Sequence, residues 1–540
     1  MSAAPTEASA PDSAAQQPSE PTPSAPQGRL LNHILELSPK LILTLEQNGV
    51  LLPGLPESKH RRTCGLPAPA PNGAPASVPY YNVLWAELSD DQKHLSIDYA
   101  EQKSKSLEAR SVKFAVPEER SKEDITQWIE LLLDRSYGSA ARRKRAWVLV
   151  NPHAGPGGAD KLWQKQVKPI FQAARMPLTV VRTSYSGEAV KLAQELNIDD
   201  FDIAIPCSGD GLPHEVFNGL GKRPDARRAL SKIAVCHIPC GSGNAMSCNL
   251  YGTHRPSLAA LAIVKGLPTP FDLVSITQGD RRTLSFLSQA LGMVADLDIT
   301  TEPLRWMGAA RFSLGFLVLA LQRRIYPCDI AVKVEIEHKE SVKKHYGRHV
   351  GRSGKSESES DGMTEIQAPS PAASSPVVGS DEDQGLPPLK YGTAADKLPE
   401  GWELVPHEKL GNFYCGNMAY MAPDMNFFSA ALANDGMMDL VTVDGDVSPL
   451  KAISLQLSVD SGEFFDSPLV SYRKISAYRI IPRENCPKGY ISIDGEAFPW
   501  EPFQAEIHQG LGLTLSKRGV YEAPGPLNWD TVTNSERLHA

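Results

Sequence analysis

Three glycine-rich segments, each directly following a short apolar run, constrain the fold of this chain more than any other feature. They span residues 151–158, 207–211 and 239–244, and segments with helical spacing separate them. A repeated order of strand, loop and helix is typical of a parallel α/β sheet, in which the carboxyl ends of the strands meet at one edge. Glycines at these strand ends expose backbone N–H groups, so the sequence predicts an edge that tolerates phosphate.

The composition excludes several classes of protein. With 540 residues, of which 41% are hydrophobic, the chain is long enough for roughly two or three domains. Its net charge of −8 argues against a nucleic-acid-binding protein, which would usually carry a basic field. The eight cysteines show neither a paired CxxC motif nor a histidine spacing suited to zinc, so we expect reduced thiols.

Changes in composition and periodicity predict the domain organisation. Residues 1–28 lack the apolar content needed for ordering and should form a disordered tail. A Ser/Glu/Pro-rich stretch at 347–390 indicates a disordered insert. The folded parts are predicted to be a β-rich region, an α/β domain and a second β-rich domain, at 29–138, 146–270 and 271–517, with a C-terminal tail at 518–540.

The first β-rich region ends in a helix. Short apolar or β-branched runs at 41–45, 80–85 and 95–99 precede an amphipathic segment at 122–133, with Trp128 on its apolar face. Several strands followed by one helix resemble a pleckstrin-homology-type module. A simple N-terminal β-rich extension would give the same pattern, and the sequence leaves both interpretations open.

No targeting or membrane-spanning segment is predicted. Residues 1–27 have neither a charged n-region nor an apolar core. The apolar run at 312–321 stops at Gln322-Arg323-Arg324 and is too short to cross a bilayer. We therefore expect a cytoplasmic protein whose membrane contact is peripheral.

Asp210 stands between two glycines at the second strand end, in the sequence Ser208-Gly209-Asp210-Gly211. A carboxylate at this point could take a proton from an attacking hydroxyl, although Gly-Asp-Gly also forms ordinary tight turns. The glycine spacing does not fit a Rossmann fingerprint, and no Walker A lysine follows a GxxxxG pattern. The three loops together predict a nucleotide that donates a phosphoryl group and is held by a different set of loops.

Taken in order, NPxxGxG, SGDGxxHEVxNGL and GSGNA resemble the diacylglycerol-kinase catalytic superfamily and, within it, the sphingosine (sphingoid long-chain-base) kinases, in a fungal-like form. The resemblance runs from about residue 146 to residue 517, apart from the insert. NAD kinase and phosphofructokinase share a GGDG-like loop but lack the His-Glu-Val run and the GSGNA loop. The resemblance implies a three-layer α/β nucleotide-binding domain and a β-sandwich lipid-binding domain, with ATP and magnesium in the cleft between them.

The resemblance also implies roles for individual residues. Asp210 would be the base for the primary hydroxyl of the lipid, Asp298 would bind the amino group of the sphingoid base, and Ser288 would be the second substrate-hydroxyl contact. A buried carboxylate needs a cation or several donors, and a sphingoid base supplies an ammonium that diacylglycerol lacks and ceramide has converted to an amide. The residues implied around ATP are Asn151, Gly155, Gly157, Thr183, Ser208, Gly209, Gly211, Gly241, Ser242, Gly243, Arg305, Arg311, Asp494 and Glu496.

The acidic and basic residues of this set have distinct implied tasks. Arg305 and Arg311 match the family's phosphate-contacting arginines and would neutralise charge on the transferred group, although surface arginines on a helix are the alternative. Asp494 would approach the nucleotide phosphates or Mg²⁺, with Glu496 nearby. The sequence leaves open whether Glu215 orients the site or faces solvent.

The predicted function is an ATP- and Mg²⁺-dependent lipid kinase that converts sphingosine, dihydrosphingosine or phytosphingosine to the 1-phosphates. It would act peripherally at internal membranes or the plasma membrane, because the lipid tail cannot be delivered from water at useful concentration. The tail is expected in an apolar pocket lined by residues 293–297 and 312–319. A ceramide or diacylglycerol kinase, or a non-catalytic lipid-binding scaffold on the same fold, is the alternative.

Overall fold

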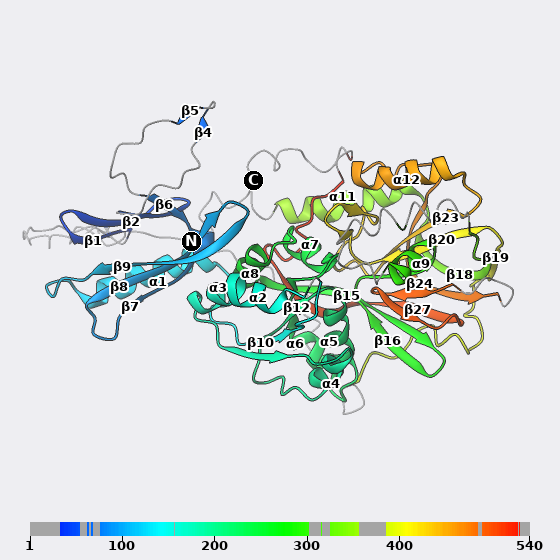
Figure 1. The fold of residues 1–540 in the computed structure, drawn as a ribbon, viewed down its shortest axis with the longest axis horizontal. Helices are drawn as coiled ribbons and strands as arrows, with labels where there is room; N and C mark the ends of the chain where they lie inside the picture. Colours follow the sequence, from blue (N-terminus) through cyan, green and yellow to red (C-terminus); the bar gives the residue numbers. More distant parts are fainter. Residues whose placement is uncertain are drawn as a thin grey trace, which may run out of the picture.

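The computed structural model describes residues 33–53, 62–63, 66–67, 76–155, 157–301, 315, 324–355, 385–483, 489–526 and 529. In chain order, an N-terminal β-rich module, a central α/β region and a C-terminal region built on a large sheet follow one another along the longest axis (Figure 1). The tail predicted at 1–28 lies outside the described residues.

Two antiparallel sheets and a helix form the N-terminal module, which we define as residues 33–138. The first sheet has the order β1 (Ile34–Ser38), β2 (Leu41–Leu45), β3 (Gly49–Leu52), β6 (Ala76–Pro79). The second has the order β7 (Val83–Leu88), β8 (His94–Lys103), β9 (Ser106–Ala115), and β4 (Arg62–Thr63) pairs with β5 (Leu66–Pro67). Helix α1 (Lys122–Tyr137) begins where the Ser121 hydroxyl accepts the N–H of Asp124, and Trp128 is buried on its apolar face as the sequence predicts.

A mostly parallel sheet forms the centre of the α/β region. The strands are β10 (Ala146–Val150), β11 (Leu178–Arg182), β12 (Ile203–Ser208), β13 (Ala234–Val235) and β14 (Ile238–Pro239), with β10 and β12 in the middle. Successive side chains of β10 enter different cores: Val148 and Val150 join one, Trp147 and Leu149 the other. The helices are α2 (Ala159–Leu162), α3 (Lys168–Ala173), α4 (Glu188–Gln194), α5 (Gly211–Gly221), α6 (Ala226–Lys232), α7 (Ala245–Tyr251) and α8 (Pro256–Lys265).

The C-terminal region is built on one eleven-stranded sheet. The strands are β15 (Leu267–Gln278), β16 (Arg281–Ser285), β17 (Ser288–Gly292), β18 (Cys328–Ile336), β19 (Val405–His407), β20 (Leu410–Gly416), β23 (Met438–Asp444), β24 (Ser471–Pro482), β25 (Ile491–Ile493), β26 (Glu496–Phe498) and β27 (Phe503–Ser516). Side chains of β15, β24 and β27 share one core with those of β17, β20 and β25. We expected these strands to form a sandwich of two sheets. Hydrogen bonds instead connect them into a single curled sheet.

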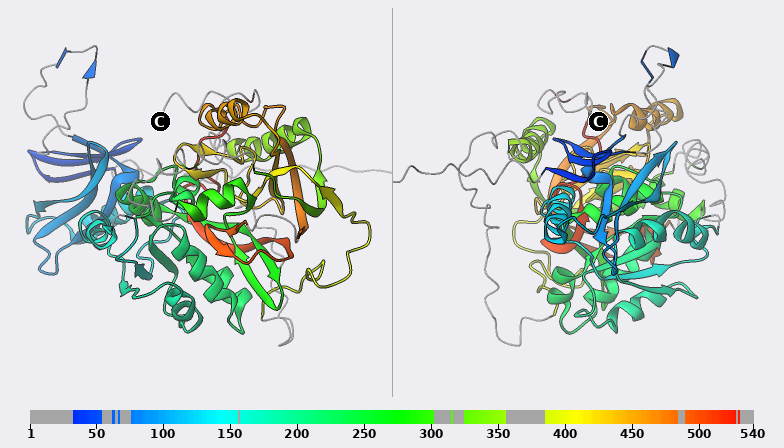
Figure 2. Two further views of the ribbon diagram at one scale, coloured as in Figure 1. Left: turned by 45° about the vertical axis from the view of Figure 1, so that its right-hand side comes forward. Right: turned by 90° about the vertical axis from the view of Figure 1, so that its left-hand side faces the viewer.

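Smaller elements cover the face of this sheet that lies opposite that core. They are α9 (Met293–Thr300), α11 (Lys339–Lys355), α12 (Pro449–Ser461) and the hairpin of β21 (Tyr420–Ala422) and β22 (Met425–Asn426). Helices α11 and α12 lie along the same side of the molecule (Figures 1 and 2), and residues of both enter one apolar core. Among the described residues, no helix is both long and apolar enough to span a bilayer.

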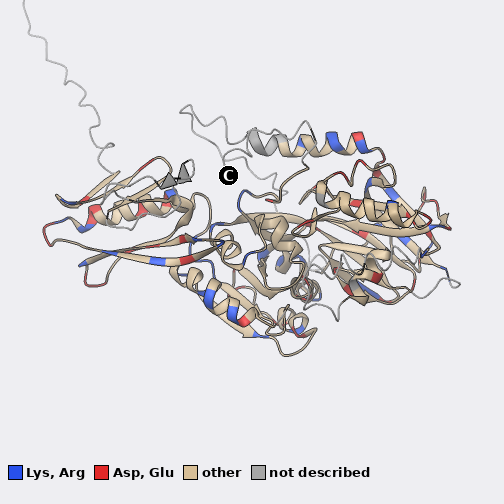
Figure 3. Ribbon diagram, turned by 45° about the horizontal axis from the view of Figure 1, so that its top comes forward, with Lys and Arg blue, Asp and Glu red and all other residues tan. Residues whose placement is uncertain are grey.

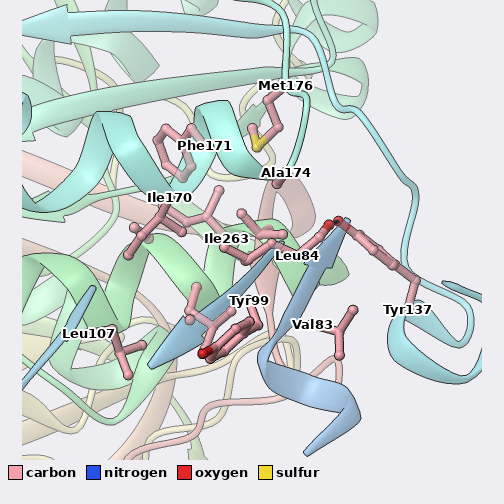
Figure 4. Close-up of a cluster of buried hydrophobic side chains, with 14 of the residues drawn as sticks. Val83, Leu84, Tyr99, Leu107, Tyr137, Ile170, Phe171, Ala174, Met176 and Ile263 are labelled. Atoms are coloured by element: carbon pink, nitrogen blue, oxygen red, sulfur yellow. Dashed lines mark hydrogen bonds between the residues drawn. The ribbon is translucent and has the colours of Figure 1, made fainter. Parts of the chain in front are cut away.

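The N-terminal module and the α/β region share a single hydrophobic core. Leu84, Tyr99 and Leu107 of the module lie beside Phe171 of α3 and Ile263 of α8 (Figure 4). Burial of this much apolar surface favours a fixed arrangement, since each large side chain removed from water contributes ~1.5–3 kcal/mol.

Buried polar contacts reinforce this shared core. The Lys265 ammonium, at the end of α8, donates to the carbonyls of Val83 and Ser136 at 2.5 and 2.9 Å, and burial holds its pKa well below the usual range. The N–H of Leu107 donates to the Ser257 hydroxyl at 2.9 Å. The module is thus held in one orientation by directional bonds as well as by apolar contact.

The structure adds detail at two places of the predicted domain organisation. Helix α11 continues to Lys355, so the predicted insert at 347–390 begins inside a helix, and residues 385–390 are also described. The predicted tail at 518–540 contains Trp529, which is 5% exposed and packs edge-on against Tyr346 and Phe465. Both differences arise because polar, Gly-rich or Pro-rich composition contains single apolar residues, Val350, Leu386 and Trp529, that pack against cores formed elsewhere in the chain.

Candidate active site

The register of the parallel sheet brings the predicted loops to one edge. Val150 pairs with Arg182 and with Cys207, and Ser208 pairs with Pro239. The residues that follow these strand ends are therefore neighbours in space. They include the predicted nucleotide-binding residues Asn151, Thr183, Gly209, Gly241 and Ser242, and the predicted residue Ser208 is the last residue of β12.

Glycine is required where the loops touch. A Cβ on Gly241 would lie 2.4 Å from the Cα of Gly209, and a Cβ on Gly155 would lie 2.5 Å from the carbonyl oxygen of Cys240. Gly155 also has a φ of +57°, in the left-handed region. Three backbones converge here without side chains between them, which is the arrangement that lets N–H groups reach phosphate oxygens.

Asn244 shapes the third loop. Its side-chain oxygen accepts the N–H of Gly241 at 2.8 Å, its amide donates to the Gly241 carbonyl at 2.9 Å, and its own φ is +57°. This left-handed turn starts α7 immediately afterwards. The first N–H groups of α7 are thereby aimed back at the second loop.

The Asp210 carboxylate receives those N–H groups. Ala245 donates to Oδ2 and Met246 to Oδ1, both at 3.0 Å, and the side chain of Asp210 is 14% exposed. A carboxylate has about four lone-pair sites, so the two amides occupy about half of them. Asp210 is thus fixed in orientation by the N-terminus of α7 and keeps acceptor capacity for a further donor.

His237 is a neighbour of Asp210 that the sequence prediction missed. Its Nε2 lies 3.0 Å from the Ser208 carbonyl, and its Nδ1 is buried, lacks a hydrogen-bond partner and lies 4.0 Å from Asp210 Oδ1. Burial lowers the pKa of His237, which keeps the ring neutral beside the carboxylate. A polar residue inside the apolar run 233–238, just before the third loop, was the available signal.

The contacts of Asp494 do not support the role that we expected for it at phosphate or Mg²⁺. Its side chain is fully buried. Five protein donors fill its two oxygens at 2.6–3.1 Å: the Ser285 hydroxyl, the His214 ring and the N–H groups of Phe286, Leu287 and Ser288. Because about four lone-pair sites serve five donors, this carboxylate has no capacity left for a metal or a nucleotide.

Asp494 instead connects the α/β region to the large sheet. His214 lies one turn into α5, the helix that Asp210 precedes, and its Nδ1 is 2.8 Å from Asp494. On the other side, the N–H of Ser288 donates to Asp494, and the Ser288 carbonyl accepts the N–H of Asp494 at 2.8 Å. The predicted substrate contact Ser288 is therefore held at a fixed position relative to the helix that carries the predicted base.

The same network sets the charge of His214. Burial disfavours the imidazolium, but the hydrogen bond to Asp494 and the charge of that residue outweigh burial and raise the pKa of His214. Asn218, one turn further along α5, fixes the next strand by donating to the Leu284 carbonyl and accepting the Leu284 N–H. The motif His-Glu-Val-Phe-Asn thus contributes docking residues rather than chemistry.

Glu496 is a solvent-facing carboxylate near Gly211, the residue that follows Asp210. Its side chain is exposed, and its Oε1 would lie 2.9 Å from a Cβ placed on Gly211. Within the described residues, no group of three or more metal-ligating side chains comes together. Mg²⁺ is commonly held by one or two carboxylates together with substrate phosphates, so the donor set of Asp210 and Glu496 fits that ion.

The remaining predicted residues lie either near the glycine loops and helix α4 or outside the described part of the structure. Gly157 lies in the first loop with a φ of +82°, and a Cβ on Gly243 would come within 3.4 Å of Asp210 Oδ2. Glu215 accepts the N–H of Ala189 at 3.1 Å, near the start of α4, so it stabilises that helix end rather than facing solvent. Asp298 belongs to α9, but its side chain lies outside the described part of the structure, as do Arg305 and Arg311.

An apolar pocket opens beside α9. Its volume is about 60 Å³, and among its lining residues are Met293, Val294, Phe427, Leu455 and Phe464. Met293 and Val294 belong to the predicted tail-binding segment 293–297, whereas 312–319 is described only at Gly315. The pocket therefore lies at the helix that carries the predicted amine-binding residue.

Two family models match parts of this chain. The diacylglycerol kinase catalytic domain family matches residues 145–276, and a family described as a domain of unknown function (DUF7493) matches residues 33–138. The matched ranges coincide with the α/β region and with the N-terminal module.

Curated relatives cover more of the chain. Sphingoid long chain base kinase 5 of Saccharomyces cerevisiae is 38% identical over 73% of this chain, and the match spans 62% of the length of that relative. Sphingoid long chain base kinase 4 of Schizosaccharomyces pombe is 32% identical over 84% of this chain and 90% of its own length. Sphingosine kinase 1 of Homo sapiens is 28% identical over 72% of this chain and 94% of its own length. This chain belongs to the sphingoid long-chain-base kinase family.

Proposed function

We infer that this protein transfers the γ-phosphoryl group of ATP to the primary hydroxyl of a sphingoid long-chain base. The observation that carries the inference is the position of Asp210. Its carboxylate is oriented by the N-terminus of α7, lies where three glycine loops converge, and retains capacity to accept a proton. Family membership supplies the class of donor and acceptor.

Each part of the site has a task in this transfer. Phosphoryl transfer depends mainly on positioning and charge neutralisation, which the backbone N–H groups of the loops at Gly155, Gly209 and Gly241 would supply to ATP. Asp210 would accept the proton of the substrate hydroxyl as that oxygen attacks the γ-phosphorus. Mg²⁺, which Asp210 and Glu496 would hold together with phosphate oxygens, neutralises phosphate charge when bound.

Binding of the lipid substrate is proposed on the other wall of the cleft. Ser288 would contact a second substrate hydroxyl, the carboxylate of Asp298 would pair with the ammonium, and the pocket beside α9 would take part of the tail. Arg305 and Arg311 would contact phosphate. This division makes 146–270 the nucleotide-binding domain, with helices on both faces of its sheet in three layers, and 271–517 the lipid-binding domain.

Association with a membrane surface follows from the substrate. A sphingoid base carries a long apolar tail and partitions into bilayers, so the enzyme would work peripherally at an internal membrane or the plasma membrane. The N-terminal module, with two sheets followed by one helix, would be a pleckstrin-homology-like element fixed to the catalytic core.

A substrate panel tests the proposed function. Purified protein with radiolabelled ATP should phosphorylate sphingosine, dihydrosphingosine and phytosphingosine, and should leave ceramide and diacylglycerol unlabelled. Labelled ceramide or diacylglycerol without labelled sphingoid base would reassign the substrate. No labelled lipid at all would favour a non-catalytic scaffold.

Asp298→Asn tests recognition of the amine. Removing one partner of a desolvated charge pair costs ~2–5 kcal/mol, so kcat/KM for sphingosine should fall on the order of 30-fold or more. ATP affinity, measured by calorimetry, should stay within about twofold, since the residue is assigned to the lipid. An unchanged rate on sphingosine would remove Asp298 from the substrate site.

A further inference from the structure

Helix α9 carries two aspartates, Asp296 and Asp298, and the proposed function uses only the second. Because successive residues turn by about 100° around an α-helix, the two positions lie about 200° apart, on different faces. Asp296 is 2% exposed. The strands of the large sheet show only scattered acidic and basic residues (Figure 3), so this buried carboxylate depends on a few specific donors.

Three donors satisfy the Asp296 carboxylate. The Tyr326 hydroxyl and the Arg324 guanidinium donate to Oδ2 at 2.6 and 3.2 Å, and the N–H of Tyr490 donates to Oδ1 at 3.3 Å. Tyr326 lies two residues before β18, and Tyr490 lies directly before β25. Asp296 therefore ties α9 to the starts of two strands, and the protein itself occupies most of the about four lone-pair sites of this carboxylate.

Tyr326 is a rigid partner for Asp296. Its side chain belongs to the apolar core of the large sheet and is 1% exposed, and its ring centre lies 6.4 Å from that of Trp500. Its N–H donates to the Leu410 carbonyl at 2.7 Å. Burial and the bond to Asp296 raise the pKa of Tyr326, so its hydroxyl stays protonated and remains a donor.

The beginning of α9 is fixed separately. A Cβ on Gly292 would lie 2.5 Å from the carbonyl oxygen of Gly411, and the side-chain oxygen of Asn412 accepts the N–H of Val294 at 3.1 Å. These contacts fix where the helix starts, and they act before its first turn is complete. The bonds of Asp296 lie further along the helix, so they determine how α9 is rotated about its axis.

We propose that Asp296 is a positioning residue for substrate recognition: by binding Tyr326, Arg324 and the Tyr490 N–H, it sets the rotation of α9 that turns the face carrying position 298 towards the substrate amine. The proposal rests on the proposed function, which assigns the amine to Asp298. Asp296 would act through Asp298 and would not touch the lipid. Its loss should therefore affect selection of the amine and leave the nucleotide side of the site unchanged.

Selectivity for the amine tests the proposal in the full chain. The measured quantity is the ratio of kcat/KM for sphingosine to kcat/KM for the analogue in which a hydroxyl replaces the amino group. Asp296→Asn should lower this ratio by about tenfold, because a misplacement of about 1 Å can cost on the order of 100-fold. Tyr326→Phe should lower it in the same direction, and the KM for ATP should stay that of wild type in both variants. An unchanged ratio in the two variants would overturn the proposal.

Tyr472→Phe is the matched control. The Tyr472 hydroxyl donates to the buried carboxylate of Asp439 at 2.5 Å, in a different apolar core, and Tyr472 is 1% exposed, as Tyr326 is. Removal of this hydroxyl should lower the thermal midpoint about as much as Tyr326→Phe does and should leave the amine selectivity unchanged. Equal loss of selectivity in both tyrosine variants would assign the effect to general loosening of the sheet and would refute a positioning role.

A double variant shows whether Asp296 acts through Asp298. The kcat/KM of Asp296→Asn/Asp298→Asn for sphingosine should lie within about twofold of that of Asp298→Asn alone, since coupled residues are not additive. Losses that add in free energy would overturn the proposal. A wild-type protein without amine selectivity would refute the amine recognition assigned to Asp298. A selective wild type whose selectivity survives in Asp296→Asn and Tyr326→Phe would refute only the role of Asp296.

Discussion

Two Asp-Gly pairs lie where the α/β region meets the large sheet, and they have opposite environments. Asp210 accepts two backbone N–H groups and is 14% exposed, whereas Asp494 accepts five donors and is fully buried. A carboxylate with spare acceptor capacity can take a proton, and a saturated one can only hold its neighbours. The same dipeptide would therefore serve chemistry in one loop, as proposed for Asp210, and architecture in the other.

Removal of the saturated carboxylate should have the largest effect on stability. Asp494→Ala would leave buried donors unpaired and His214 without its counter-charge, so the free energy of unfolding should fall by ~3–5 kcal/mol. Urea denaturation followed by circular dichroism measures this. A loss below about 1 kcal/mol would show that the donors find other partners and that Asp494 does not hold the cleft.

The partner of Asp494 should show a smaller, pH-dependent effect. His214→Ala removes a hydrogen bond to a charged group, worth ~1.5–3 kcal/mol. The folded-state pKa of His214 is raised above its ordinary value of 6.5, so its stabilisation is fully present below that value and is lost as pH rises through the folded pKa. Denaturation at about pH 6 and about pH 8 should therefore show the larger gap between wild type and variant at the lower pH. An equal difference in stability between wild type and variant at both pH values would show that the charged pair of His214 and Asp494 does not stabilise the fold.

A disturbed contact between the loops near Asp210 should weaken nucleotide binding rather than unfold the protein. Gly241→Ala would force the second and third loops apart, because its Cβ would lie 2.4 Å from Gly209. ATP affinity should fall about tenfold, or ~1.4 kcal/mol. Gly158→Ala is the matched control, since no atom lies within 4 Å of its Cβ and its φ of −104° suits any residue. Equal ATP affinity of the two variants would contradict a close-packed phosphate cradle.

The sequence predicted the Asp210 side of the cleft better than the Asp494 side. The loops around Asn151, Gly209 and Gly241 follow buried strands, and the parallel register converts their order along the chain into proximity. The hydrogen-bond donors to Asp494 come from residues more than 200 positions away in the sequence. No local pattern shows that five donors converge on one carboxylate. His237 was missed for a related reason, because it comes near Asp210 only when the strands of the sheet are assembled.

Tertiary burial accounts for the other differences between prediction and structure. Local composition at Trp529 and along α11 is polar or irregular, yet Tyr346 of α11 and Phe465 both pack against Trp529. The N-terminal module was recognised as strands followed by a helix, but its shared core with α3 and α8 depends on side chains from three separate regions of the chain. Periodicity identifies the faces of such elements and leaves their partners unspecified.

The turnover number of Asp210→Asn, measured at saturating ATP and sphingosine, tests the contrast between the two aspartates most directly. Loss of a general base should lower kcat by ~10²–10⁴-fold, while the thermal midpoint remains close to that of wild type. Asp494→Asn, assayed in parallel, should instead show a lowered thermal midpoint. An Asp210→Asn variant that keeps kcat within about tenfold of wild type would contradict the assignment of Asp210 as the base.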